Sequence, residues 1–389
     1  MGWKECNAMD ERIRFVVRAL EGETVSSLCR EFGISRKTGH KMLNRYRDYG
    51  VEALRDQKRQ PLRNANKLPY QIEEIILNLK EEKPDWGARK IREILIRKYP
   101  DIKPPAKSTV HAVLERNGKV SRRGRARQRA TGTPLSEPHS ANDLWCADFK
   151  GQFRLGNHKY CYPLTLTDSA TRYLLACEAL DSVCEKHVFT VFEEVFKQRG
   201  LPLAIRTDNG VPFASPRGLF GLSRLSVWWL TLGIAIERIK PGNPQQNGRH
   251  ERMHRTLKKG TTKPAGTNLL QQQEKFNRFI DEFNNERPHE SLQMKYPSEC
   301  YTPSKRNYKD TLPIDYPMHD AVAKVFDSGY FSFNGHRVYL SRALAGSSVG
   351  ISEQDDGIWL VSFMNYDLGF FDTESEKFEQ GQNPFGLQV

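Results

Sequence analysis

The 389-residue sequence predicts a multidomain protein with helix-turn-helix units, an α/β core on a mixed sheet, and a small C-terminal β-barrel. Three observations support this prediction. Apolar residues recur with a helical period up to about residue 118, and strand-like runs alternate with helical ones from about residue 142. Aromatic alternating runs joined by Asn-Gly and Asp-Gly turns then fill the end of the chain. This length suits two to four domains.

Basic residues are concentrated in the N-terminal third. Lys and Arg number 60 against 47 Asp and Glu; residues 1–140 carry 31 basic and 18 acidic residues, and the rest carries 29 of each. Because phosphate contacts supply most non-specific affinity for nucleic acids, this distribution indicates a nucleic-acid partner. A basic surface that only aids solubility is the alternative. The motifs below favour nucleic acid.

The cysteines and the apolar runs indicate where the protein resides. The seven cysteines are scattered and form no CxxC pair, so we expect a reduced, cytoplasmic protein with buried free thiols. No apolar stretch approaches the roughly 18 residues of a membrane span. The N-terminus lacks the apolar core of a signal peptide. We therefore expect no membrane partner.

Residues 1–60 predict a helix-turn-helix domain. A first helix would place Ile13, Val16, Val17 and Leu20 on its inner face. After Gly22 come a short helix, a break at Gly33, and a basic helix capped by Ser35. A basic second helix is typical of a recognition helix in the major groove. Its exposed DNA contacts would be Arg36, Lys37, His40 and Lys41. The alternative is a plain three-helix bundle with a charged face.

Residues 61–117 predict a second helix-turn-helix domain, and a basic linker follows at 118–140. Within the second domain one helix starts after Pro84 and another would be capped by Ser108. Lys107 and His111 would contact DNA, although His111 fits a half-buried packing role equally well. The linker lacks apolar periodicity and is expected to lie along phosphates. Its basic residues are Arg122, Arg123, Arg125, Arg127 and Arg129. A simple flexible hinge is the alternative.

The predicted core at 141–300 contains three carboxylates at positions where they could form one metal site. Three strand-like runs are followed by alternating helices and strands, which predicts a mixed sheet covered by helices. Asp148 lies on the first strand, Asp208 ends a later one, and Glu251 lies on a helix. Such side chains can converge on Mg²⁺, a hard cation that prefers oxygen ligands. With a basic chain around them, a phosphodiester substrate is expected, and hence DNA cutting and joining.

The motifs around these carboxylates carry a specific resemblance. Asp148 in W-x-x-D-F, Asp208 in T-D-N-G and Glu251 in N-P-Q-Q-N-G-R-H-E-R resemble the integrase core of the DDE transposases. The run F-N-N-E-R-P-H-E-S-L is similar to a sequence typical of bacterial insertion-sequence transposases. The resemblance covers roughly residues 142–300. It implies a ribonuclease-H-like core, like that of retroviral integrases, with Asp148, Asp208 and Glu251 as its catalytic and metal-binding triad.

The resemblance also implies the chemistry. Two Mg²⁺ ions, which Mn²⁺ can replace, would be bound by the triad, and no nucleotide cofactor would be needed. One departure concerns the Asp208–Glu251 separation of 43 residues, which is several residues longer than is typical. An insert around residues 211–226 accounts for the difference and leaves the path of this loop open.

Several residues near the triad are given roles by their spacing. His254, Arg255 and Lys258 lie at i+3, i+4 and i+7 from Glu251 and are expected to share its face. Arg255 and Lys258 would contact substrate phosphates, although they could simply balance local acids. Asn209 is a candidate to steer Asp208 through a turn hydrogen bond, although a plain turn role fits it equally well. Two other acids, Asp168 and Glu237, are assigned ordinary solvent-facing positions.

The chain ends in a linker at 301–319 and a predicted barrel at 320–389. Asn334-Gly335 and Asp356-Gly357 each mark a hairpin turn. The net negative charge of this region argues against independent DNA binding, so we expect contacts with other subunits.

Together these features predict a bacterial, nucleoid-associated transposase that acts as a homo-oligomer on DNA. It would bind double-stranded DNA at the terminal inverted repeats of its element, cleave the ends by metal-dependent hydrolysis, and join the 3′-hydroxyl ends to target DNA. A catalytically inactive, transposase-derived regulator and a metal-dependent nuclease that cuts without joining are the alternatives.

Overall fold

The computed structural model describes residues 7–56, 68–120, 135–308 and 314–385. Compact packing divides the chain into two units, Met1–Ile72 and Glu73–Val389. The predicted linker arginines from Arg122 to Arg129 lie outside the described residues.

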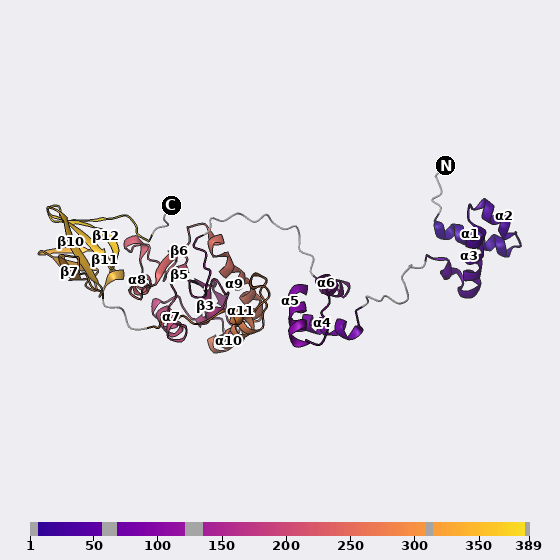
Figure 1. Cartoon of the computed structure of the whole chain (residues 1–389), viewed down its shortest axis with the longest axis horizontal. Helices are drawn as coiled ribbons and strands as arrows, with labels where there is room; N and C mark the ends of the chain where they lie inside the picture. The colour runs from indigo at the N-terminus through magenta and orange to yellow at the C-terminus, as the bar shows by residue number, and fades with distance from the viewer. Residues whose placement is uncertain (1–6, 57–67, 121–134, 309–313, 386–389) are drawn as a thin grey trace. The chain divides into compact units, whose positions relative to one another are not determined.

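The first unit is a helix-turn-helix bundle (Figure 1). Its helices are α1 (Ala8–Leu20), α2 (Val25–Glu31) and α3 (Arg36–Tyr49), followed by the short 3₁₀ turn η1 (Val51–Leu54). The Ser35 hydroxyl accepts the Thr38 N–H at 3.1 Å, which confirms the predicted cap of α3. The inner face of α1 differs from the prediction. Phe15 and Val16 are buried, whereas Val17 and Leu20 are exposed, because α1 is rotated to bring Phe15 against Phe32.

A second trio of helices begins the second unit. It comprises α4 (Tyr70–Glu82), α5 (Ala88–Lys98) and α6 (Lys107–Arg116), with Ile76, Ile91 and Val110 buried among them. The predicted cap of α6 by Ser108 is wrong. The N-cap is Ala106, two residues before Ser108, so Ser108 lies within the first turn of the helix.

The region predicted as the α/β core, residues 141–300, is built on a mixed sheet, as predicted. Its strands are β1 (Leu144–Phe149), β2 (Phe153–Arg154), β3 (Tyr160–Asp168), β4 (Leu174–Leu180), β5 (Ala204–Thr207) and β6 (Ala235–Arg238). β3 pairs antiparallel with β1, β2 and β4, whereas β1, β5 and β6 are parallel. The sheet order is β2-β3-β1-β5-β6. The antiparallel half comes first in sequence and the parallel half follows.

Helices cover this sheet through two apolar clusters. α7 (Glu185–Arg199) and α8 (Arg224–Thr231) belong to the cluster that contains Trp145, Phe192 and Trp229. α9 (Gly248–Thr261) and α10 (Leu269–Asn285) belong to the cluster that contains Leu257 and Phe276. Trp229 lies within the first cluster, and the half-buried Trp228 packs against it. Shorter helical turns are η3 (Pro244–Asn247), η4 (Glu290–Leu292) and α11 (Pro297–Cys300).

The C-terminal region is all β. Its strands are β7 (Ala321–Lys324), β8 (Tyr330–Phe333), β9 (His336–Tyr339), β10 (Ser348–Asp355), β11 (Ile358–Phe363), β12 (Tyr366–Asp372) and β13 (Lys377–Gln380), with the turn η5 (Arg342–Leu344) between β9 and β10. Both predicted hairpin turns are confirmed. The predicted barrel is not closed: the described strands pair as an open five-stranded sheet, β13-β12-β11-β10-β7, and a separate β8–β9 hairpin.

The insert between Asp208 and Glu251 packs against these C-terminal strands. Ala214 and Leu222 form an isolated β-bridge, and η2 (Leu219–Gly221) lies between them. Leu219, Phe220 and Leu222 share one apolar cluster with residues of the C-terminal sheet. The insert therefore forms part of the core of the C-terminal region.

Four of the described cysteines are buried free thiols, as predicted, whereas Cys184 is exposed and Cys300 is half-buried. None of the helices in the described part of the chain is long and apolar enough to cross a membrane.

Candidate active site

Asp148 and Asp208 occupy equivalent ends of neighbouring parallel strands. The register of β1 and β5 pairs Cys146 with Arg206, so Asp148 and Asp208 follow two residues further along each strand. The Asp208 carboxylate accepts the N–H of Gly210 at 3.0 Å, which fixes its side chain within the turn. Asn209 does not steer Asp208. Its amide donates instead to the Ile239 carbonyl at 2.7 Å and joins the end of β5 to the end of β6.

Electrostatic coupling links all three predicted triad residues. The pKa of Asp148 is raised to about 7, first because its carboxylate is largely buried and next because Asp208 lies nearby. Glu251 raises this pKa further, whereas Lys150 opposes the increase. Repulsion of this kind arises when carboxylates share a site without a compensating cation. The donor set, oxygen atoms of three acids, fits a hard divalent cation.

Glu251 lies on the exposed face of α9, together with Arg255 and Lys258. These three positions, at i, i+4 and i+7, therefore present one carboxylate and two cations to solvent on one side of the helix. The placement of His254 on this face is wrong. His254 belongs to the buried face of α9, together with His250, Met253, Leu257 and Thr261.

The buried face of α9 is joined to β3 by a polar network. The Thr165 hydroxyl donates to the Asp148 carbonyl at 3.0 Å. Its oxygen lies 2.8 Å from His250 Nε2 and 2.6 Å from His254 Nε2. The Thr167 hydroxyl lies 2.7 Å from His250 Nδ1. Both histidines, which flank Glu251 in sequence, thus attach its helix to the strand that pairs with the strand of Asp148.

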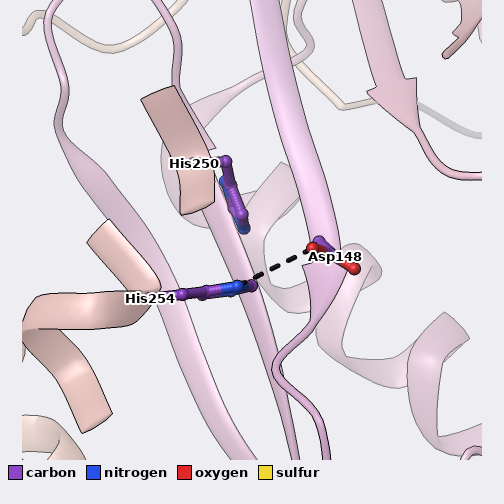
Figure 2. Close-up of side chains that lie close together, drawn as sticks. All are labelled: Asp148, His250 and His254. Carbon is purple, nitrogen blue, oxygen red and sulfur yellow. Dashed lines mark ion pairs between the residues drawn. The ribbon is translucent and has the colours of Figure 1, made fainter. Parts of the chain in front are cut away.

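His254 also faces Asp148 directly, as Figure 2 shows, with 3.7 Å between Nδ1 and the carboxylate Oδ2. Burial and Lys150 lower the pKa of His254 to about 3, and burial together with His254 lowers the pKa of His250. Both rings are therefore neutral near pH 7. Within the described part of the chain, Asp148, His250 and His254 form a group whose ligand atoms all lie within 4.8 Å of one another.

The spacing of apolar residues could have revealed this network. His250 and His254 continue the i, i+3, i+4, i+7 pattern set with Met253 and Leu257, which predicts that both histidines are buried. Their partners Thr165 and Thr167 alternate with apolar residues on β3, but the pairing of these threonines with α9 depends on tertiary contacts.

Asp168 and Glu237 are structural and do not face solvent. Asp168 is fully buried and accepts hydrogen bonds from the Asn142 N–H at 2.7 Å and from the Thr171 N–H at 2.8 Å. Glu237 pairs with the buried guanidinium of Arg206. Arg206 also donates to the Gln246 carbonyl at 3.2 Å, so this pair supports the turn that precedes α9.

The predicted DNA contacts within the described residues are all available to a ligand. Arg36, Lys37, His40 and Lys41 are exposed on α3, and Lys107 and His111 are exposed on α6. The half-buried alternative for His111 is therefore wrong. Arg36 and Lys37 lie in the first turn of α3, where the recognition helix of a helix-turn-helix contacts base edges.

Family comparisons agree with this division of the chain. Residues 138–244 and 232–297 match integrase core domains. Residues 11–61 match a helix-turn-helix domain, and residues 38–114 match a homeodomain-like domain. The chain thus carries DNA-binding-type domains followed by an integrase core.

Two insertion-element proteins and one solved structure are similar to parts of the chain. An uncharacterized protein of insertion element IS407 from Burkholderia multivorans is 25% identical over 58% of this chain and 78% of the relative. An uncharacterized protein of insertion element IS476 from Xanthomonas euvesicatoria is 28% identical over 42% of this chain and 44% of the relative. The solved catalytic core of HTLV-2 integrase in complex with magnesium aligns with 42% of this chain and 98% of that chain, at 15% identity and a TM-score of 0.33.

Proposed function

We propose that this chain, a DDE polynucleotidyl transferase with the integrase core and helix-turn-helix domains of insertion-sequence transposases, cleaves the ends of a mobile element and joins them to target DNA. The observation that carries the proposal is geometric: Asp148 and Asp208 lie at equivalent positions on the paired strands β1 and β5, and the helix of Glu251 is attached beside them through Thr165. Three acids at the end of two parallel strands and on one exposed helix face fit a phosphodiester-cleaving centre.

The triad would hold the divalent cations. Asp148, Asp208 and Glu251 supply carboxylate oxygens, and we propose Mg²⁺, replaceable by Mn²⁺, with two ions at each site. When bound, such ions lower the pKa of an attacking water or 3′-hydroxyl and stabilise the leaving oxygen. The carboxylates would position the cations. The positive charge of the bound cations would in turn offset the repulsion between the carboxylates.

The remaining residues would hold the DNA. Arg255 and Lys258, exposed on the same face as Glu251, would pair with phosphates next to the scissile bond. The exposed residues of α3 and α6 would bind the terminal inverted repeats. The linker arginines Arg122, Arg123, Arg125 and Arg127 would follow the backbone between these two sites.

Hydrolysis must precede joining, because it releases the 3′-hydroxyl that joining uses. Hydrolysis at each element end leaves a 3′-hydroxyl, and this hydroxyl then attacks a phosphodiester of the target. Each new phosphodiester replaces one that breaks, so joining needs no nucleotide cofactor. We propose that the two ends are brought together by a homo-oligomer assembled on DNA in the bacterial cytoplasm, associated with the nucleoid.

The test is nicking and joining of element-end DNA with Mg²⁺ or Mn²⁺, comparing the wild type with E251Q. E251Q keeps the size of the side chain and removes its charge. Cleaved and joined products that disappear in E251Q are expected. Cleavage that survives in E251Q would contradict the triad. Cleavage without joining would identify a nuclease, and tight end binding without cleavage would identify a DNA-binding regulator.

A further inference from the structure

A single hydroxyl proton determines the chemistry of the histidines behind the triad. Thr165 Oγ1 has one proton and three polar neighbours: the Asp148 carbonyl, His250 Nε2 and His254 Nε2. The carbonyl can only accept, so the hydroxyl proton goes to Asp148. Both histidines must then donate their Nε2–H to the same oxygen. Thr165 thus fixes the tautomer of both rings.

This tautomer leaves the two rings with different roles. His250 Nδ1 accepts from the Thr167 hydroxyl at 2.7 Å, so both of its nitrogens are engaged. His254 Nδ1 has a lone pair instead, and this lone pair faces Asp148 Oδ2 at 3.7 Å. A neutral imidazole nitrogen and a carboxylate oxygen are both electron-pair donors, and a metal cation between them would make their approach favourable.

We propose that His254 Nδ1 is a further ligand of the metal ion that Asp148 holds, which gives this ion a mixed carboxylate and imidazole environment. The inference rests on the proposed function. Neighbouring ligands with bonds of about 2.1 Å lie roughly 3.0–3.6 Å apart, close to the observed 3.7 Å. The other ring nitrogen, Nε2, already contacts the Thr165 hydroxyl oxygen, and a metal-bound histidine usually donates its second N–H to such an acceptor.

The surroundings favour an ion at this position. His254 is only 7% exposed and Asp148 23% exposed, so the carboxylate opens toward solvent while the imidazole approaches from the protein side. Burial keeps the His254 ring neutral near pH 7, as a metal ligand must be. Mg²⁺ is a hard cation that is bound through oxygen ligands, whereas Mn²⁺ belongs to the first-row divalent metals that sites containing nitrogen also bind, so His254 would make the site favour Mn²⁺ over Mg²⁺.

The experiment uses full-length protein and Mn²⁺ alone as the probe. Electron spin-echo spectroscopy of bound Mn²⁺ detects a directly bonded nitrogen through its nuclear modulation. The key variant is H254Q, whose amide reaches the position of Nε2 and can still donate to Thr165 but places no atom at Nδ1. Its counterpart is H254N, which keeps an atom near Nδ1 and loses the bond to Thr165. H250N is the matched control, and D148N tests the ion itself.

We expect nitrogen modulation in the wild type and in H250N, and none in H254Q. The Kd for Mn²⁺ should rise about 10-fold in H254Q, whereas the Kd for Mg²⁺ should change much less. H254N measures how much the hydrogen bond to Thr165 contributes to stability. If H254N is destabilised and H254Q is not, the loss of Mn²⁺ binding in H254Q results from the missing Nδ1 and not from disturbed packing. Circular dichroism checks that each variant is folded.

Two results would overturn the assignment of His254: bound Mn²⁺ without nitrogen modulation in the wild type, or modulation that persists in H254Q. Both leave the proposed function intact if D148N loses Mn²⁺ binding. Wild-type protein that binds no Mn²⁺, or D148N that binds it as tightly as the wild type, would instead contradict the proposed function together with this inference.

Discussion

Thr165 and Asp148 lie directly opposite each other in the antiparallel register of β1 and β3, and the Thr165 hydroxyl donates to the Asp148 carbonyl at 3.0 Å. Because the same oxygen also contacts both histidines of α9, the strand of the first carboxylate and the helix of the third meet at one hydroxyl group. The relative position of Asp148 and Glu251 therefore depends on this side chain.

Replacing Thr165 with Val should destabilise the protein by about 2 kcal/mol or more. Val has nearly the same shape but offers no acceptor, so two buried imidazole N–H groups would lose their partner, at about 1–3 kcal/mol each. Urea unfolding of T165V measures the loss. T165S, which keeps the hydroxyl, is the control and should stay closer to the wild type. A T165V protein as stable as T165S would show that the hydroxyl contributes little.

Acid should unfold the protein through its buried histidines. Burial lowers the pKa of His254 and of His289 to about 3, whereas the unfolded value is near 6.5. The unfolded chain therefore binds more protons, and stability falls as pH drops from about 6.5 toward 3. Each such proton contributes about 1.4 kcal/mol per pH unit within this window.

The measurement is the free energy of unfolding in urea between pH 4 and pH 8, without metal ions. The variant H254Q should show a smaller decrease between pH 6.5 and pH 4 than the wild type does. Equal pH slopes for the two proteins would mean that His254 is not held neutral by its burial.

Removing one partner of the buried Arg206–Glu237 ion pair should lower the free energy of unfolding substantially. The variant R206M leaves the Glu237 carboxylate, whose side chain is only 16% exposed, without its cation. We expect a loss of about 3 kcal/mol, as is usual when one partner of a buried pair is removed. The double variant R206M/E237M should recover much of this loss. A double variant no more stable than R206M would show that the other bonds of Arg206 dominate.

DNA binding should depend on the first turn of α3. The variants R36A and K37A should each weaken binding to element-end DNA and, where the lost contact is a phosphate, reduce the salt dependence of log K by about one charge. Fluorescence anisotropy at several salt concentrations measures both effects. The exposed Arg14 on α1, which pairs with Glu11, supplies the control R14A. Binding that is reduced equally by R14A would point to general electrostatics and not to α3.

Local patterns predicted the elements well because each is determined by nearby residues. The cap at Ser35 and the hairpin at Asn334-Gly335 depend on a few adjacent side chains, and the structure confirms both. The mixed sheet followed from the order of strand and helix patterns. In each case the interactions that form the element lie within its own sequence window.

Features that depend on tertiary contacts were missed or misplaced. The burial of His254 and Asp168 results from packing between segments far apart in sequence, so each was assigned to solvent or to the wrong face. The barrel was overestimated for a related reason. Alternation and turns specify hairpins, but closure depends on how the first and last strands meet.

The insert after Asp208 has a consequence for how this protein can be divided. Leu219, Phe220 and Leu222 follow Asp208 by 11 to 14 residues and bury their side chains among C-terminal strands. Removing those strands would expose these apolar side chains to solvent on the loop that follows Asp208. The region 141–300 is thus not separable from the C-terminal strands, and we expect a fragment that ends near residue 300 to aggregate, because the loop after Asp208 would lose its packing partners.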